Sequence, residues 1–303
     1  MTMLKQQKVF FIKWCRSLLV LLLSLYAYNT HNLAHAQYFT GTVAQSLGGS
    51  GRAAAEEGEE TFLNPAALAH SADYTADFVY GDDGRFRDQS GYFWAVSFTD
   101  NNPDVMVPGA LQFVKKLRSF SGLPDVEETF WQVSMGNFYR EHLAIGLSVY
   151  RLQLDVAQSE DHVFWDGVLG VHYNPIPDYA VAVVFYNVIG TPEAVPVHLK
   201  QPQKVMLGNS YLVSDFVRVR FDIGRQVQLN PDTKWEVQTG FESFLNDFSI
   251  LRFGYHSDPI RDLEGVSAGI SFNGPRLKAD YTFVKNTKAD GGQLHSIDLR
   301  IPF

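Results

Sequence analysis

The last part of the chain, residues 217–303, alternates apolar and polar side chains. Residues 217–223 read Val-Arg-Val-Arg-Phe-Asp-Ile. The same period recurs in residues 235–242, 251–255, 266–272, 277–283 and 297–303. Successive side chains of a strand point to opposite faces, so this period predicts strands with one apolar and one polar face. A soluble sandwich would pack the apolar faces of two sheets together, whereas a membrane barrel turns them to lipid and encloses the polar faces.

The amino-terminal residues have the features of a secretory signal peptide. Four basic residues lie at or before Arg16, an apolar run follows at residues 18–27, and Ala34-His35-Ala36 provides an A-x-A cleavage site. The apolar run is about ten residues long, too short for a helix that crosses about 30 Å of hydrocarbon. We therefore expect residues 1–36 to be a cleaved signal peptide and the mature chain to begin at Gln37.

The remaining residues have the composition of an exported, acidic protein. Residues 1–36 hold four of the 25 basic residues, none of the 33 acidic ones and the only cysteine, so the mature chain has a formal charge of −12. This charge argues against nucleic-acid binding, because no basic face is available for phosphates. Beyond the signal peptide, no stretch has the 18 apolar residues of a membrane helix. These features are typical of the Gram-negative outer membrane.

Fourteen strand candidates follow residue 71, and most are 8 to 12 residues long. They are residues 72–80, 90–98, 107–114, 129–138, 143–154, 164–173, 179–188, 204–212, 216–227, 234–244, 248–256, 265–273, 277–284 and 293–303. A tilted strand needs about 9 to 11 residues to cross a bilayer, whereas strands of globular proteins usually have about 5 or 6. The sequence therefore predicts an all-β protein, a 14-stranded antiparallel transmembrane β-barrel over residues 72–303.

The connections between these candidates alternate in length. If the first strand runs outward, connections such as 115–128 and 189–203 lie outside, and shorter ones such as 139–142 and 213–215 lie inside. The exception is the first inner connection, 99–106. Short periplasmic turns and longer external loops are typical of bacterial barrels. The even strand count also brings both ends of the barrel sequence to the same side.

Residues 37–71 do not alternate. Small residues at 46–55 precede an acidic run at 56–60 and an Asn64-Pro65 turn, which predicts a compact, kinked segment. Residues 49–54 match G-x-G-x-x-A, but no βαβ unit follows, so a dinucleotide site is not expected. The acidic run lacks the spacing of an EF-hand loop and is interpreted as a solvated face rather than a calcium site.

This segment resembles the amino-terminal segment of FadL-type long-chain fatty-acid transporters and of PorV-like outer-membrane proteins. The shared features are Ser46 to Gly51, which includes Gly48, Gly49 and Gly51, then Glu56 and Asn64-Pro65-Ala66. Residues 207–211, 240–242 and 251–255 resemble later strands of the same families. The resemblance implies a plug at residues 37–71 within a fourteen-stranded barrel. It also implies hydrophobic or lipid-like ligands, for which Phe62 and Leu63 of the plug are the candidate binding residues.

The polar faces of the late strands carry charges of both signs. The expected lumen lattice consists of Arg218, Arg220, Asp222, Glu236, Glu242, Arg252, Lys278, Asp280, Asp298 and Arg300. Neighbouring strands would pair these charges across a polar interior. Such a lattice either selects a solute or, as is more common, supports the barrel. Glycines 224, 240, 254 and 269 fall on the same face and leave room for the plug or mark bends.

Catalysis finds little support in the sequence. The seven histidines of the mature chain are scattered and form no HExxH pair, no GxSxG is present, and Asp161-His162 is a single adjacent pair. We expect no enzyme activity, no cofactor and no metal site. The first functional hypothesis is an outer-membrane barrel that binds or transports hydrophobic molecules. The alternative is a structural, lipid-associated barrel that forms homo-oligomers or serves secretion, and the short external loops favour it.

Overall fold

The computed structural model describes residues 39–54, 58–71, 73–85, 89–101, 105–120, 124–157, 159–196, 199–227, 235–259, 263–288 and 291–303. The expected signal peptide, residues 1–36, and its boundary at Gln37 lie outside these ranges. Within the described residues, no helix is long and apolar enough to cross a membrane, a finding that concerns helices alone.

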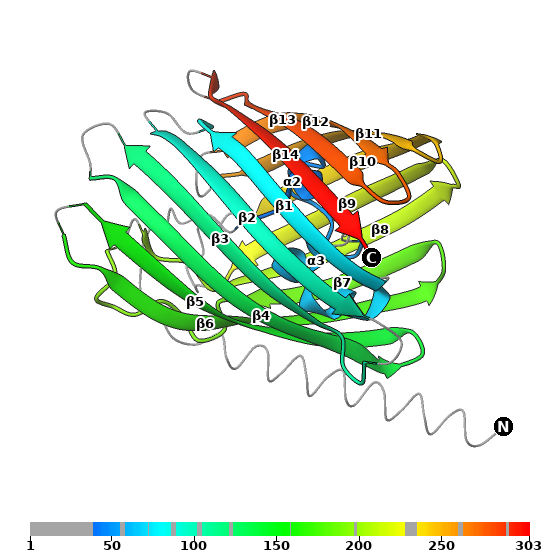
Figure 1. The fold of residues 1–303 in the computed structure, drawn as a ribbon, viewed down its shortest axis with the longest axis horizontal. Helices are drawn as coiled ribbons and strands as arrows, with labels where there is room; N and C mark the ends of the chain where they lie inside the picture. The colour runs from blue at the N-terminus through cyan, green and yellow to red at the C-terminus, as the bar shows by residue number, and fades with distance from the viewer. Residues whose placement is uncertain are drawn as a thin grey trace.

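Fourteen antiparallel strands form a closed barrel in which each strand pairs with its neighbours in the sequence, and β1 pairs with β14 (Figure 1). The strands are β1 (Asp73–Asp83), β2 (Gln89–Asn101), β3 (Gly109–Phe120), β4 (Val126–Arg140), β5 (Leu143–Val156), β6 (His162–Ile176), β7 (Tyr179–Tyr186), β8 (Lys204–Ser214), β9 (Val217–Gln226), β10 (Glu236–Asn246), β11 (Ser249–Asp258), β12 (Leu263–Asn273), β13 (Lys278–Asn286) and β14 (Gln293–Pro302). The predicted all-β, fourteen-stranded antiparallel barrel is confirmed.

The strand ends differ most from expectation between β3 and β4. The sequence predicts a connection at 115–128, but β3 continues to Phe120 and β4 begins at Val126. The polar sequence of residues 115–128 is typical of a loop, yet its charged side chains pair across β3 and β4. Lys115 Nζ lies 2.8 Å from Glu127 Oε1, and Arg118 pairs with Glu128. Opposite charges on neighbouring strands stabilise the pairing, so the sheet extends through this region.

The barrel has two distinct ends. Connections 141–142, 177–178, 215–216 and 247–248 are tight turns at one end, which we call the short-turn end. The opposite, long-loop end carries the longest connection, residues 187–203, where β7 stops at Tyr186 and β8 starts at Lys204. The expected start of this connection at residue 189 is therefore two residues late. The alternation of short and longer connections agrees with the pattern predicted from the sequence.

The two faces of the sheet differ in chemistry. Large apolar side chains such as Phe253 and Ile270, each 54% exposed, cover the outer face. The alternate positions of the same strands, such as Arg252 and Ser271, are buried inside the barrel. This distribution is the reverse of that in a soluble sheet, where the apolar face is the buried one.

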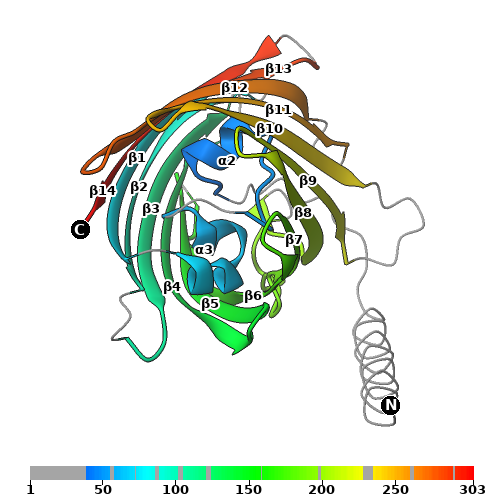
Figure 2. The same cartoon turned by 90° about the vertical axis from the view of Figure 1, so that its right-hand side faces the viewer.

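Short helices of the inner part of the chain lie inside the ring of strands (Figure 2). They are α2 (Thr42–Ser46), α3 (Glu60–Leu63) and the 3-10 helix η1 (Pro65–His70). We call residues 39–54 and 58–71 the inner segment. Helix α2 packs against β11, β12, β13 and β14, and η1 packs against β4, β5 and β6. The inner segment therefore reaches from one side of the barrel interior to the other.

Candidate functional site

A set of inward-facing glycines receives the backbone of the inner segment. A β-carbon added at Gly254 would lie 2.1 Å from Gly48 N, and one added at Gly146 would lie 2.3 Å from Ala66 N. Other wall glycines make comparable approaches to the inner segment, and we call the whole set the glycine belt. It consists of Gly136, Gly146, Gly170, Gly208, Gly240, Gly254 and Gly269. Of the four glycines singled out from the sequence, Gly224 is the exception, because Met206 of the wall fills the space beside it.

The Gly-rich motif and the Asn-Pro turn shape the inner segment. Gly48, Gly49 and Gly51 have φ values of 67°, 85° and 142°, which side chains other than glycine rarely adopt. Asn64 Oδ1 accepts a hydrogen bond from Ala66 N at 3.0 Å and so caps η1, while Pro65 occupies the first turn of that helix. Gly48, Gly49, Gly51, Asn64 and Pro65 therefore have local structural roles in the inner segment.

A buried ion pair fixes the inner segment to β9. Arg52 Nη1 lies 2.8 Å from Asp222 Oδ2, and Arg52 and Asp222 are 2% and 0% exposed. The same oxygen accepts hydrogen bonds from Gly51 N at 3.0 Å and Arg52 N at 3.1 Å. Arg52 also donates to Tyr186 Oη at 3.0 Å and to Gln238 Oε1 at 2.7 Å. This network spreads the buried charges over several partners, which a buried pair needs in order to be stable.

The inward charges of the late strands form a second network. Arg220 Nε and Arg252 Nε each lie 2.9 Å from a Glu242 oxygen, and Arg252 Nη1 lies 2.8 Å from Asp280. Arg300 pairs with Asp298 at 3.0 Å. The register sets Asp280 opposite Asp298, two like charges that Arg300 bridges. Of the expected lattice residues, Arg218 is more distant, 3.6 Å from Glu242, and Glu236 instead pairs with Lys204 at 2.9 Å. Lys278 is half-buried at the strand end.

Sequence reasoning missed several members of these networks, among them Asp77 and Arg52. Asp77 of β1 lies 2.6 Å from Arg300 Nε, across the seam where β1 closes on β14. The sequence signal that could have identified Asp77 is its position on the inward face of an alternating strand. Arg52 is in the Gly-rich motif, and nothing local in the sequence indicates its partner 170 residues later.

An aromatic-lined cavity of about 50 Å³ lies between the inner segment and the wall, toward the long-loop end. We call it the apolar cavity. It is lined by Phe39, Phe62, Val114, Lys116, Glu128, Phe130, Gln132, Tyr150, Leu152, Val168, Tyr186 and Gln201. The ring centroids of Phe62 and Phe39 are 4.7 Å apart, and those of Phe130 and Tyr150 are 4.8 Å apart. Such a lining favours an apolar or aromatic molecule with few polar groups.

The two candidate ligand-binding residues of the inner segment have different positions. Phe62 is part of the lining of the apolar cavity. Leu63 is outside that lining: its side chain lies beside Gly51, and its carbonyl accepts a hydrogen bond from Tyr186. The difference follows from helix α3, in which consecutive side chains point in different directions.

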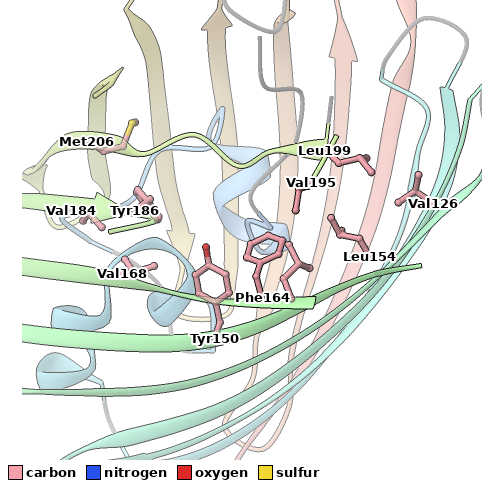
Figure 3. Packing of buried hydrophobic residues seen from close by; sticks show 11 residues of the cluster. Val126, Tyr150, Leu154, Phe164, Val168, Val184, Tyr186, Val195, Leu199 and Met206 are labelled. Atoms are coloured by element: carbon pink, nitrogen blue, oxygen red, sulfur yellow. The ribbon is translucent and has the colours of Figure 1, made fainter. Parts of the chain in front are cut away.

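The described parts of the β7–β8 connection, residues 187–196 and 199–203, pack against apolar side chains that border the apolar cavity. Val195 and Leu199 are buried in the same cluster as Leu154 and Phe164, and Figure 3 shows these side chains gathered together. Tyr150 Oη donates to Gln201 Oε1 at 3.0 Å and also contacts Asn187, so both ends of the connection bond to one wall residue. Gln201 of the connection is itself part of the lining of the apolar cavity.

A second cavity, of about 290 Å³, opens toward the short-turn end and has a more polar lining. We call it the inner-turn cavity. Its lining includes His70, His172, Asn174, Asp178, Ser210 and Arg218. On β6, Gly170 of the belt lies between Val168 of the apolar cavity and His172 of the inner-turn cavity. The glycine belt therefore separates the two cavities.

Glu59 and Glu60, the two described glutamates of the acidic run, are buried, so the interpretation of this run as a solvated face is wrong for them, and burial raises their pKa values. Burial raises the pKa of Glu60 from its ordinary value of 4.5 to about 8, with Asp77 adding to the rise. Burial also raises the pKa of Glu59 to about 7, although Arg300 and the N–H groups of Val43 and Ala44 oppose the rise. Glu60 Oε1 accepts a hydrogen bond from Ser71 Oγ at 2.9 Å, and its Oε2 has no hydrogen-bond partner among the described residues.

We expect the inner segment to be held more firmly at low pH. A carboxyl group whose pKa is higher in the folded state stabilises that state fully below pH 4.5, and the contribution is lost as the pH rises through about 8. Protease cleavage within residues 39–71 should therefore be slower at pH 5 than at pH 9. Glu60→Gln should flatten this dependence, whereas the exposed Glu160→Gln should leave it unchanged. A wild-type pH profile retained in Glu60→Gln would exclude Glu60 as the cause.

Within the described ranges, no group of three or more His, Cys, Asp or Glu side chains is placed to hold a metal ion.

No protein-family model matches the sequence, and no curated protein matches it. Solved structures do match the fold. The toluene transporter TbuX of Ralstonia pickettii has a TM-score of 0.65 and 13% identity, over 88% of this chain and 99% of that one. The CymD monoaromatic hydrocarbon channel has a TM-score of 0.65 and 15% identity, over 87% and 97%. A FadL homologue of Pseudomonas aeruginosa has a TM-score of 0.63 and 11% identity, over 87% and 98%.

These likenesses concern the fold, because all three identities are low. The chain has the fold of FadL-type outer-membrane barrels, as the resemblance of its sequence motifs indicates. The three matched structures are a transporter, a channel and a FadL homologue.

Proposed function

We propose that this chain spans the outer membrane of a Gram-negative bacterium and admits small hydrophobic molecules through its lumen. The observation that carries the proposal is the apolar cavity, whose aromatic lining comes from both the wall and the inner segment. In this proposal residues 37–71 are a plug, and the ligand is held between the plug and β3–β7. No enzyme activity is part of the proposal.

The outer face supports the membrane setting. Exposed side chains such as Phe221, Ile270 and Leu299 would cost free energy in water over so wide a surface. In a bilayer they contact acyl chains, and the charged residues stay inside the barrel. Outer-membrane lipids are therefore the expected partners of this face.

The cavity's size favours a compact ligand. About 150 Å³ is enough for benzene in an engineered apolar cavity, and the apolar cavity has about 50 Å³. A single-ring molecule would enter only if lining side chains such as Phe39 and Phe62 rotated to enlarge the cavity, and an extended acyl chain would need a larger rearrangement still. The names of two matched structures, a toluene transporter and a monoaromatic hydrocarbon channel, support this size class.

Passage to the periplasm requires the plug to move. The glycine belt brings the plug backbone against the wall between the two cavities, and the Arg52–Asp222 pair holds it there. We infer that a ligand passes from the apolar cavity to the inner-turn cavity when these contacts between the plug and the wall break.

Filling the cavity should abolish binding. Val168→Phe adds a ring inside the apolar cavity, whereas Val171→Phe adds the same ring on the outer face of the same strand. In nanodiscs, ¹⁹F NMR of 4-fluorotoluene should show a bound resonance for the wild type and Val171→Phe, and at least tenfold weaker binding for Val168→Phe. Equal binding by both variants would show that the ligand is in lipid and not in the cavity.

The tight packing of the plug against the barrel wall also supports a second candidate function, that of a structural barrel that associates with lipid. In that case homo-oligomerisation or secretion, rather than solute passage, would be its role. Uptake of radiolabelled toluene by intact cells distinguishes the two. Cells producing the wild-type barrel should take up toluene faster than cells producing Val168→Phe. Equal uptake by both, with no bound fluorotoluene in the wild type, would favour the structural function.

A further inference from the structure

The apolar cavity is lined by two buried glutamines whose carboxamide groups are only partly hydrogen-bonded. Gln132 of β4 and Gln201 of the β7–β8 connection are 2% and 7% exposed, and both line the cavity. Gln132 Nε2 donates to the carbonyl oxygen of Thr61 at 2.9 Å and to Gln112 Oε1 at 2.8 Å. A carbonyl only accepts hydrogen bonds, so these contacts fix which end of the carboxamide is the nitrogen. Gln132 Oε1 is left without a hydrogen-bond partner among the described residues.

Gln201 presents a complementary group. Its Oε1 accepts a hydrogen bond from Tyr150 Oη at 3.0 Å, and its backbone N–H and carbonyl both bond the hydroxyl group of Thr191 at 3.0 Å. These contacts hold the residue in place, while its Nε2 has no hydrogen-bond partner in the part of the chain that the structure describes. Gln132 lies directly opposite Tyr150 in the register of β4 and β5. The two glutamines therefore lie around one tyrosine and offer both an acceptor and a donor.

The charged side chains of the lining are already in ion pairs. Lys116 Nζ lies 3.8 Å from Asp83 Oδ2, and Glu128 pairs with Arg118. A carboxylate that entered the cavity would lose its hydration and would have to compete with Asp83 for Lys116, the cation in the lining. The lining therefore favours a neutral ligand over an anionic one.

A ligand that fills the cavity displaces water from the two carboxamide groups. A hydrocarbon ring makes no hydrogen bond to Gln132 Oε1 or Gln201 Nε2, and a buried donor or acceptor without a partner costs free energy. A hydroxyl group both donates and accepts, so it can bond either atom. The aromatic side chains of the lining, such as Phe62 and Phe130, remain available to the ring that carries this hydroxyl group.

We propose that the apolar cavity prefers a neutral, hydroxylated single-ring molecule of the phenol class. Its ring lies against Phe62 and Phe130, and its hydroxyl group bonds Gln132 Oε1, Gln201 Nε2 or both. The two glutamines then determine specificity, because they favour a phenol over a hydrocarbon of the same size. This inference rests on the proposed function, since it names the class of molecule that the same cavity binds.

Two ligands of nearly equal size test this preference. 4-Fluorophenol has a hydroxyl group where 4-fluorotoluene has a methyl group, and ¹⁹F NMR in nanodiscs measures the affinity of the full mature chain for each. We expect the ratio of the two affinities, phenol over toluene, to fall at least fivefold in Gln132→Leu and in Gln201→Leu. Gln153→Leu, which changes a glutamine on the outer face of β5 beside Arg151, should keep the wild-type ratio.

The ratio separates recognition of the hydroxyl group from a structural role of the glutamines. Loss of the bond to Thr61 would weaken both ligands alike and leave the ratio unchanged. An unchanged ratio in both Gln132→Leu and Gln201→Leu, with both ligands bound, would overturn the phenol preference and leave hydrophobic binding intact. Binding of 4-fluorobenzoate as tight as that of 4-fluorophenol would also overturn it. Failure of the wild type to bind either ring would contradict the proposed function and this inference together.

Discussion

Asp222→Ala should destabilise the protein by about 3–5 kcal/mol, the usual cost of removing one partner of a buried ion pair. Arg52 is 2% exposed and would keep its charge without the carboxylate that faces it. The N–H groups of Gly51 and Arg52 would lose the same acceptor. Urea unfolding in detergent micelles measures the total cost, and protease cleavage within residues 39–71 reports release of the inner segment.

The matched control replaces both partners. Arg52→Met with Asp222→Leu removes both charges and keeps apolar volume, so it should recover most of the lost free energy of unfolding. Exposed Asp247→Ala, in a short turn, should change it by less than about 0.5 kcal/mol. If Asp222→Ala were as stable as Asp247→Ala, the ion pair would not anchor the segment.

Phe221→Arg should have the second large effect, about 2–4 kcal/mol if the outer face lies in lipid. Phe221 is near the middle of β9, points outward and is 41% exposed. A guanidinium there would be at the depth where hydrocarbon solvates charge least, and the cost falls toward the interfaces. Unfolding in phospholipid vesicles provides the measurement.

Arg218→Ala, on the same strand, is the comparison. Arg218 is partly exposed and 3.6 Å from Glu242, and such a pair contributes about 0–1 kcal/mol. A loss for Phe221→Arg no larger than that for Arg218→Ala would contradict the assignment of the outer face to lipid.

The barrel could be predicted from the sequence because the alternation of apolar and polar side chains is local to each strand and recurs from strand to strand. Successive residues of a strand face the outer and the inner side of the barrel alternately, so each strand shows its two faces in its own sequence. Strand ends were less predictable, because the residue at which a strand ends depends on its pairing with residues of the neighbouring strand. Residues 115–120 form a strand because Glu127 and Glu128 face Lys115 and Arg118 from β4. A charge-rich stretch read alone is indistinguishable from a loop.

The candidate site depends on contacts between distant segments, which no local pattern reports. Arg52 meets Asp222, and His70 meets His172, only because the inner segment folds back through the barrel. Gly240, Gly254 and Gly269 could be singled out from the sequence as glycines that leave room for the segment, but which residue of the segment each one meets could not. Likewise, Phe62 and Leu63 are adjacent and similar in sequence, and only the orientation of α3 distinguishes the residue at the cavity from its neighbour.

The most direct test of the account is to locate a hydrophobic ligand in the barrel. Crystals of the mature chain soaked with bromobenzene should show an anomalous bromine peak between Phe62, Phe130 and Tyr150, and the peak should be absent in Val168→Phe. Bromine found only against the outward aromatic side chains, or retained in Val168→Phe, would contradict the claim that this barrel binds hydrophobic molecules between its inner segment and its wall.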